Sequence, residues 1–355
     1  DADSRAALAL IYMRNGRLES PVKLQLSETQ ALERLGSDLG RCILALEALR
    51  GSLVLFSHAS GESAWQFKHP TIGDAYATLL MQSPEHLDIF IQGSAPDRLI
   101  DQVTCGDVGL EKAIVVPKSL FPPMLARLRE MLQSRSYKTA WLSTFGAKRD
   151  LQGFLANRCS KEFLSLYLKD NPDLLDQVSE PGLFLDTVPE VRLAKRLHQF
   201  GLLPEEKRKK FVETVSTYAL DGQDGDALDD DGIQSLFTSE EFEELVHRVR
   251  TELLPRLDDV RHEWESNHSA GEPPDEHMQQ LLEFFSSVKE RFMDDEGTVK
   301  LIDRQIERTN EWIDENTPEE PERSPRKLGK IETPAESRSA RSIFDDIDAN
   351  EDADG

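Results

Sequence analysis

Hydrophobic and polar residues alternate in two different ways within the first eighty residues. Apolar positions first recur at helical intervals, which predicts three helices, at residues 4–15, 27–35 and 37–50. The spacing changes to period two in Leu53–Phe56 and Trp65–His69, which predicts a β-hairpin around a turn at residues 58–62. Pro70 ends the second strand, and a single apolar stripe then predicts a helix over 71–81.

This order of elements predicts a winged-helix domain at residues 1–83, in a chain that is mostly α-helical. Residues 84–220 contain further segments with helical spacing, separated by prolines, which predicts an irregular helical array. Residues 221–315 are predicted to form an acidic helical region that opens with a solvated loop at 221–232. The helices of this region are expected at residues 239–268, with a kink at Pro255, at 275–293 and at 297–315.

Residues 316–355 are rich in Pro, Glu, Ser, Arg and Asp and hold few apolar side chains. This composition predicts a disordered acidic tail, because the segment cannot bury enough apolar surface to offset the entropy of folding. Ile343 and Phe344 interrupt the acidic run and predict a short peptide that docks on a protein partner.

The net charge of −24 falls entirely on the second part of the chain. Residues 1–220 carry 27 acidic and 27 basic side chains, whereas residues 221–355 carry 39 acidic and 15 basic ones. Such an acidic surface repels nucleic acid and anionic membranes. No window approaches the roughly 18 consecutive apolar residues of a transmembrane helix. Three cysteines, far apart in sequence, argue against a disulfide framework and for a reducing, cytoplasmic compartment.

Several motif interpretations fail on spacing. The chain has no Gly-x-x-x-x-Gly-Lys-Ser/Thr loop and no Rossmann glycine fingerprint, so no phosphate cradle of its own is predicted. The acidic run 221–232 fits no EF-hand register, and His262 and His268 lack the spacing of a zinc site, so no metal is expected. There is no nucleophile elbow, which leaves a hydrolase site assembled from scattered residues as an open alternative.

The basic run Lys207–Lys210 has two interpretations. It could be a nucleic-acid patch, but Glu205 and Glu206 stand four residues before Lys209 and Lys210. That spacing is typical of ion pairs on a helix surface. The run therefore predicts a solvated helix face.

A winged helix commonly binds DNA through its third helix, here residues 37–50. That helix carries Arg41, Glu47 and Arg50 with apolar positions between them, which is a poor surface for phosphate contacts. Nucleic acid is therefore not the expected partner. A winged-helix transcription regulator with an acidic helical partner domain is the alternative interpretation of the chain.

The segment Trp65-Gln-Phe-Lys-His-Pro-Thr-Ile-Gly-Asp-Ala-Tyr-Ala-Thr-Leu-Leu80 resembles the end of the winged-helix domain in STAND-class NTPases. It is most similar to the bacterial group called novel STAND type 3. In that group an aromatic-x-aromatic-x-His-Pro-Ser/Thr strand runs into a helix with Asp-Ala or Asp-Phe. Similar features continue through Pro84–Phe90 and Leu99–Val103, so the resemblance covers less than a third of the chain.

The resemblance implies a regulatory switch in prokaryotic conflict or antiviral defence. A P-loop domain upstream on the same polypeptide would bind ATP or ADP, and the winged helix would close over the nucleotide. The helical region would sense a trigger, and activation would produce a homo-oligomer. In related apoptosis and plant-resistance proteins, a histidine at this strand-to-helix corner contacts the ADP β-phosphate, and His69 has the matching position. Those relatives have Asp directly after the histidine, whereas this chain has Pro70 and its nearest acid is Asp74.

The physical environment expected for His69 suits a phosphate contact. An imidazole at the start of the helix 71–81 lies beside unpaired backbone N–H groups, so an anion there would meet both. The alternative is that His69 only caps the wing and packs on Trp65, which with Phe67 is predicted to belong to the core. The sequence thus predicts the regulatory part of a STAND-class, ATP-dependent signalling switch, with no catalytic residue in this chain.

Overall fold

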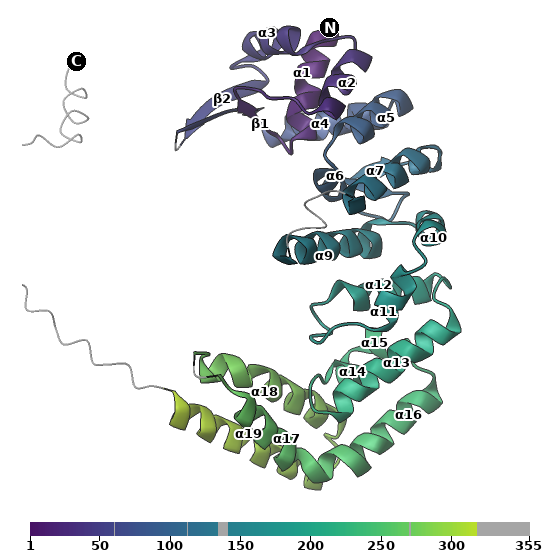
Figure 1. Cartoon of the computed structure of the whole chain (residues 1–355), viewed down its shortest axis with the longest axis vertical. Coiled ribbons are helices and arrows are strands. Elements are labelled where there is room, and N and C mark those ends of the chain that lie inside the picture. Colours follow the sequence, from purple (N-terminus) through teal and green to yellow (C-terminus); the bar gives the residue numbers. More distant parts are fainter. Residues whose placement is uncertain (60, 112, 134–140, 270, 318–355) are drawn as a thin grey trace, which may run out of the picture. The chain divides into compact units, whose positions relative to one another are not determined.

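A computed structural model of the chain describes residues 1–317 except residues 60, 112, 134–140 and 270 (Figure 1). The chain divides into two units, Asp1–Glu315 and Asn316–Gly355. The described part is mostly helical, as predicted, and also contains a three-stranded antiparallel sheet. The expected tail, with Ile343 and Phe344, lies outside the described residues from residue 318 onward.

The first seven elements follow the predicted order with one addition. They are α1 (Ala2–Met13), β1 (Arg17–Ser20), α2 (Leu26–Arg34), α3 (Leu39–Leu49), β2 (Val54–Ala59), β3 (Glu62–Phe67) and α4 (Pro70–Met81). The three predicted helices and the hairpin are confirmed. Strand β1 was not predicted, because its sequence Arg-Leu-Glu-Ser offers only one apolar residue to the period-two pattern.

The sheet has the strand order β1-β3-β2, with both neighbours of β3 antiparallel to it. Trp65 on β3 is opposite Leu18 of β1 and Phe56 of β2. Leu18 and Trp65 are buried with Leu46 of α3 in one hydrophobic cluster, so the sheet and the helices share a core. Trp65 is therefore a core residue, as expected.

A series of helices, α5 to α13, follows α4 along the chain. They are α5 (Pro84–Gly93), α6 (Pro96–Gln102), α7 (Phe121–Gln133), α9 (Trp141–Arg158), α10 (Lys161–Asp170), α11 (Leu174–Ser179), α12 (Pro189–Gln199) and α13 (Glu205–Leu220), with a 3-10 turn at Lys118–Leu120. Gly93 permits the close packing of α5 on α2, because a Cβ at residue 93 would lie 2.7 Å from the Cβ of Ala31.

Two short parallel strands lie within this helical part, β4 (Val103–Cys105) and β5 (Ile114–Val116). The sequence analysis predicted only helices with short breaks here, so this pair is a correction. Runs of three β-prone residues are too short for a clear periodicity, and the strands are identified by their mutual hydrogen bonds. The backbone of Cys105 also forms an isolated parallel β-bridge with the backbone of Cys159, just after α9.

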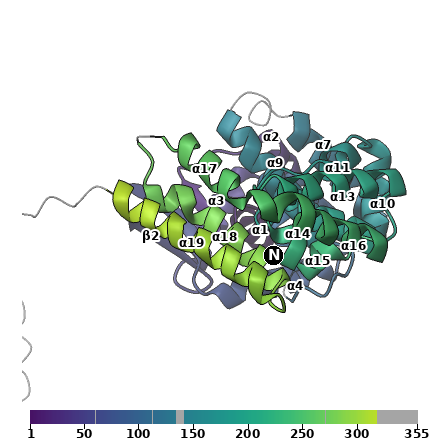
Figure 2. The ribbon, with the colours of Figure 1, turned by 90° about the horizontal axis from the view of Figure 1, so that it is seen from below.

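The last described elements are α14 (Asp226–Asp229), α15 (Asp231–Gln234), α16 (Ser239–Arg248), a π-turn at Val249–Leu253, a 3-10 turn at Leu254–Arg256, α17 (Leu257–Asn267), α18 (Pro274–Arg291) and α19 (Glu296–Asn316). The predicted interruption at Pro255 is confirmed, because the proline removes one helical hydrogen bond and crowds the preceding turn. In Figure 2, α17, α18 and α19 lie side by side, joined by ion pairs from α19 to each of the other two.

Candidate functional site

His69 lies at the corner between β3 and α4, as the sequence analysis predicted. It is the N-cap of α4, and its Nδ1 accepts a hydrogen bond from the backbone N–H of Thr71 at 3.3 Å. The Thr71 hydroxyl lies 2.9 Å from the same nitrogen. Because a neutral imidazole that accepts at Nδ1 carries its proton on Nε2, the capping contact fixes Nε2 as a hydrogen-bond donor.

The imidazole of His69 is exposed, and no partner of Nε2 is found among the described residues. In the first turn of α4, Pro70 has no N–H, the Thr71 N–H is bonded to His69, and the Ile72 N–H donates to the His69 carbonyl at 3.0 Å. The helix start therefore adds the positive end of its dipole to the corner, and the donor that remains for a ligand is the Nε2–H of His69. The capping role that the alternative interpretation gave to His69 is present, and the ring of Trp65 pairs with Phe56 at a centroid distance of 4.6 Å.

Two large apolar side chains of α3 are exposed, Leu44 at 71% and Ile43 at 39%, and we call these two residues the α3 face. Leu53, just before β2, and Leu55 on β2 are exposed as well. The same helix also exposes Arg41 and Glu47. Large apolar side chains that stay exposed can belong to a surface that binds another protein.

Cations near the α3 face are engaged within the chain. Arg41 contacts Asp38 at 2.9 Å, and Arg50 lies 3.6 Å from Glu47 and over the ring of Phe56. Each charge is thereby partly neutralised. The expectation that this helix is poorly suited to phosphate contacts agrees with these pairs.

The basic run on α13 pairs with other partners than those predicted. Lys207 pairs with Asp176 and Lys210 with Glu180, both on or beside α11. Arg208 is 4% exposed, so it is not part of a solvated face. Glu205 pairs with Arg208 three residues on instead of with Lys209, and the partners of Lys207 and Lys210 come from a distant segment, which the helical spacing could not indicate.

Arg208 joins three segments. Its guanidinium donates to the carbonyl of Leu236 at 2.6 Å and to the carboxylates of Glu205 and Glu241. The Arg208 hydrogen bonds lower the pKa of Glu241 to about 2. A buried guanidinium with its donors satisfied is a structural joint.

The acidic segment 221–232 is not a solvated loop, which corrects the sequence interpretation. Ala227 and Leu228 are fully buried, and Asp224 is buried too. The Asp224 carboxylate accepts hydrogen bonds from the backbone N–H groups of Leu185 and Asp226 at 2.9 and 3.0 Å. The segment therefore packs as the turn and the short helix α14 that follow α13, and Asp224 ties it to the loop before α12.

An acidic cavity of about 340 Å³ adjoins this segment. Its walls include Asp186, Asp224, Asp226, Asp229 and, from α18, Glu283. Burial, followed by the neighbouring Asp224 and other aspartates, raises the pKa of Asp226 to about 7. Mutual repulsion of carboxylates is thus built into the fold at this point.

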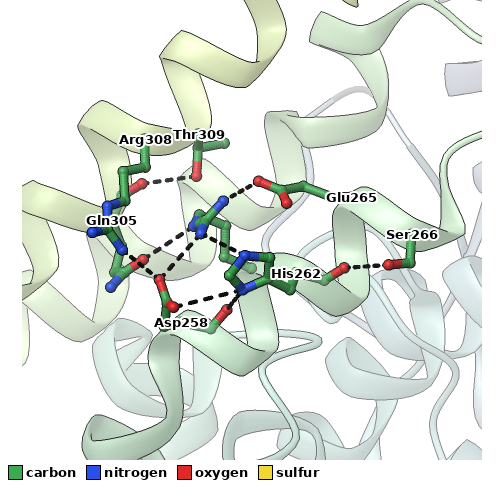
Figure 3. A network of polar contacts seen from close by, with 8 residues as sticks. Asp258, His262, Glu265, Ser266, Gln305, Arg308 and Thr309 are labelled. Carbon is green, nitrogen blue, oxygen red and sulfur yellow. Dashed lines mark hydrogen bonds and ion pairs between the residues drawn. The ribbon is translucent and has the colours of Figure 1, made fainter.

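A polar network joins α17 to α19 (Figure 3). Buried Arg261 donates to the Gln305 side chain at 3.2 Å and to Asp258 at 3.1 Å, and it pairs with Glu265. Arg308 of α19 contacts Asp258 at 2.7 Å. Since these groups satisfy one another, the network is a structural joint between the two helices.

The two histidines considered for zinc belong to different environments. The His262 ring lies against Asp258 in the network of Figure 3, whereas His268 contacts the rings of His277 and Trp312. Among the described residues, no group of three or more His, Cys, Asp or Glu side chains could hold a metal ion. None of the described helices is long and apolar enough to cross a lipid bilayer.

Cys105 and Cys159 are brought together by the fold, which the sequence analysis did not foresee. Their backbones form a β-bridge between the end of β4 and the residue after α9, and both side chains are fully buried. Their separation in sequence hides this proximity, and only the pairing of β4 could have indicated it.

Comparison of the chain with protein-family models, with curated proteins and with solved structures finds no match.

Proposed function

We propose that the chain is the regulatory part of a STAND-class nucleotide switch, in which residues 1–83 are a winged helix and His69 contacts a nucleotide phosphate. The order helix, strand, two helices and a β-hairpin, with the first strand beside the last, supports the winged-helix assignment. The ATP or ADP would be held by a P-loop domain upstream on the same polypeptide, in the cytoplasm. This proposal rests on the resemblance of residues 65–80.

The observation that carries the proposal is the Nε2–H of His69. The capping bond of Thr71 leaves Nε2 as a solvent-facing donor beside the start of α4. A β-phosphate oxygen placed there would accept from the imidazole and lie near the positive helix end. Pro70 at the first position of α4 does not interfere, since that residue has no helical N–H partner in any case.

The α3 face supports a protein partner. Leu44 and Ile43 would contribute apolar contacts to the upstream nucleotide-binding domain, which the proposal makes their partner. Oligomerisation on activation and sensing by the helical region belong to the same proposal. So does a role in antiviral or conflict defence, and docking through the Ile343 and Phe344 peptide.

The test is the nucleotide that co-purifies with the full-length gene product, released by denaturation and measured by chromatography. We expect ADP or ATP near one per chain in the wild type. His69→Ala should lower that content. Absence of nucleotide from the wild type would overturn the proposal.

Two further variants separate capping from phosphate binding. His69→Asn keeps an N-cap acceptor for Thr71 but loses the distal donor, so it should retain the melting temperature and lose nucleotide. His69→Gln places an amide donor near the Nε2 position, so it should retain more nucleotide than His69→Asn. If both variants keep the full nucleotide content, His69 is a cap alone.

The element order also favours the alternative, a winged-helix DNA-binding regulator. Duplex DNA binding that weakens steeply with salt would support the alternative. The ion pairs of Arg41 and Arg50 and the apolar α3 face argue for protein in preference to DNA.

A further inference from the structure

Two of the three cysteines form a buried pair that the proposed switch does not use. Cys105 ends β4, and Cys159 follows α9. The two residues are partners in a parallel bridge, and the Ser160 N–H donates to the Cys105 carbonyl at 2.8 Å. Backbones joined in this way hold the two Cα atoms at the separation that a disulfide requires.

The side chains also meet. Burial raises the pKa of the Cys159 thiol well above its usual value, and the adjoining Cys105 thiol raises it further. Both side chains are fully buried, and both cysteines are free thiols. Two neighbouring thiols on backbones paired in this way are the arrangement from which a disulfide can form.

The backbone around the pair is held from both sides. Arg158 reaches the Val103 carbonyl at 3.4 Å, and Gly106 follows Cys105 with φ +86°. A Cβ at residue 106 would lie 2.8 Å from the Cβ of Ser160, so only glycine permits this approach of the two segments. The proximity of Cys105 and Cys159 is therefore enforced by the fold.

The guanidinium of Arg196, on α12, interacts electrostatically with the Cys159 thiol. Arg196 lowers the pKa of the Cys159 thiol, against the larger effect of burial. The guanidinium lies over the Phe200 ring at 4.3 Å, and its Nε is buried with no hydrogen-bond partner among the described residues. A buried, unsatisfied N–H of a cation is expected to have a use, and stabilisation of a transient thiolate would supply one.

Cys42 provides an internal comparison. It is also fully buried, but its neighbour is the hydroxyl of Ser37, at 3.5 Å from its sulfur. No second cysteine is its partner among the described residues. Burial alone therefore does not distinguish the pair, whereas the bridge and Arg196 do.

We propose that Cys105 and Cys159 are a redox pair that forms a reversible intramolecular disulfide, with hydrogen peroxide as the oxidant. The disulfide links β4 to the segment after α9 and closes residues 105–159 into a loop.

The reaction balances in two steps. One thiol of the pair loses its proton, its sulfur takes one oxygen from hydrogen peroxide, and one water is released, which leaves a sulfenic acid. The sulfur of the other cysteine then bonds to the oxidised sulfur, and the sulfenic hydroxyl leaves as a second water with the proton of that cysteine. Two thiols are oxidised and one peroxide is reduced to two waters. A dithiol reductant reverses the change by thiol–disulfide exchange.

Burial sets the rate. The pair opens to peroxide only when the local structure fluctuates, so oxidation should be slower than that of an exposed thiol and faster in mild denaturant. Once formed, the disulfide restricts the unfolded chain, so the oxidised protein should melt at a temperature several degrees higher than the reduced protein.

The test is peptide mapping of the purified folded chain after hydrogen peroxide treatment, acid quenching and thiol blocking without reduction. We expect a Cys105–Cys159 linked peptide that disappears with dithiothreitol, and a Cys42 that remains blocked as a thiol. Cys42→Ser should give the same linked peptide. Blocked thiols at 105 and 159 in the folded, peroxide-treated protein would overturn the proposal, and so would linkage of Cys42 to either residue.

Single variants test the steps, with circular dichroism to confirm folding. Cys105→Ala and Cys159→Ala should each prevent the linked peptide and leave a sulfenic acid at the remaining cysteine of the pair that a dimedone-type probe labels. Arg196→Met should slow disulfide formation several-fold without changing its end point. Absence of the label in both cysteine variants would contradict the sulfenic acid step. An unchanged rate in Arg196→Met would contradict the role of Arg196.

Discussion

On α3, leucine and isoleucine side chains face solvent, whereas on α13 and α17 arginine side chains are buried. Leu44 is 71% exposed, and Arg208 and Arg261 are each less than a tenth exposed. Both arrangements cost free energy in an isolated chain unless something offsets the cost. The two regions differ in where the interactions that offset this free-energy cost are found.

For Arg208 and Arg261 the offsetting hydrogen bonds and ion pairs lie within the chain. Arg208 contacts Glu241 of α16 and the Leu236 carbonyl, and Arg261 contacts Glu265 of its own helix and the Gln305 amide of α19. For the α3 face no covering element is found among the described residues. The comparison teaches that buried charge marks joints within the fold, whereas exposed apolar residues mark a surface available to a partner.

The largest effect is expected from Arg208→Ala. Removal of the guanidinium leaves the carbonyl of buried Leu236 without this donor and the half-buried Glu241 without its cation, so the free energy of unfolding should fall by about 2 kcal/mol. Urea denaturation measures it. Lys209→Ala, an exposed neighbour on the same helix, should change it by less than about 0.5 kcal/mol. Equal effects of the two substitutions would show that the joint does not depend on the buried charge.

The pH dependence of this joint has a definite sign. The pKa of Glu241 is lowered to about 2 by Arg208, so its stabilising effect is present above the ordinary value and is lost as pH falls through 2. At neutral pH the pair is therefore intact. The Arg208→Ala comparison is best made there.

Asp226→Asn is expected to have a smaller effect than Arg208→Ala and to raise the free energy of unfolding. The pKa of Asp226 is raised to about 7, so its contribution to stability is greatest below the unfolded value and is lost as pH rises through 7. The groups that face it are Asp224, Asp186 and Asp229, with Glu283 of α18 in the same cavity. At pH 8 the neutral amide should raise the free energy of unfolding by about 1 kcal/mol, after allowance for solvent screening.

The measurement is urea denaturation of both proteins between pH 5 and pH 8. The advantage of Asp226→Asn should shrink as pH falls, because the wild-type carboxyl becomes protonated. Asp221→Asn, an exposed aspartate of the same segment, is the control. A constant difference between Asp226→Asn and the wild type across the range would contradict the repulsive cluster.

The order of α1 to α4 could be predicted because it depends on local patterns. Apolar spacing, the caps at Asp38 and His69 and the proline at residue 70 all act within a few residues. Strand β1 could not be predicted, since Leu18 is its only strongly apolar residue and its pairing partner is the distant β3.

The burial of charge in α13–α19 could not be read from composition. The acidic run 221–232 has the composition of a solvated loop, yet Asp224 is satisfied by backbone N–H groups that come from residue 185 as well as from its own segment. The ion pairs of the run Lys207–Lys210 could not be predicted for the same reason, because its partners on α11 and α16 are far away in sequence. For the candidate site, the position of His69 could be predicted, but its fixed tautomer required the contact with Thr71.

The smallest effect on stability, and the one that tests the other side of the comparison, is expected from Leu44→Asp. Because Leu44 is largely exposed, the free energy of unfolding should change by less than about 0.5 kcal/mol. In the full-length gene product, however, a charge on the α3 face should disrupt its contact with the nucleotide-binding domain and lower the co-purified nucleotide. Leu26→Asp is the matched control, since Leu26 is 75% exposed but lies on α2, outside the α3 face. Loss of nucleotide in Leu44→Asp alone would make the exposed leucine a docking residue. Equal retention in both variants would make it an ordinary surface residue, and the contrast with the buried arginines would then say nothing about partners.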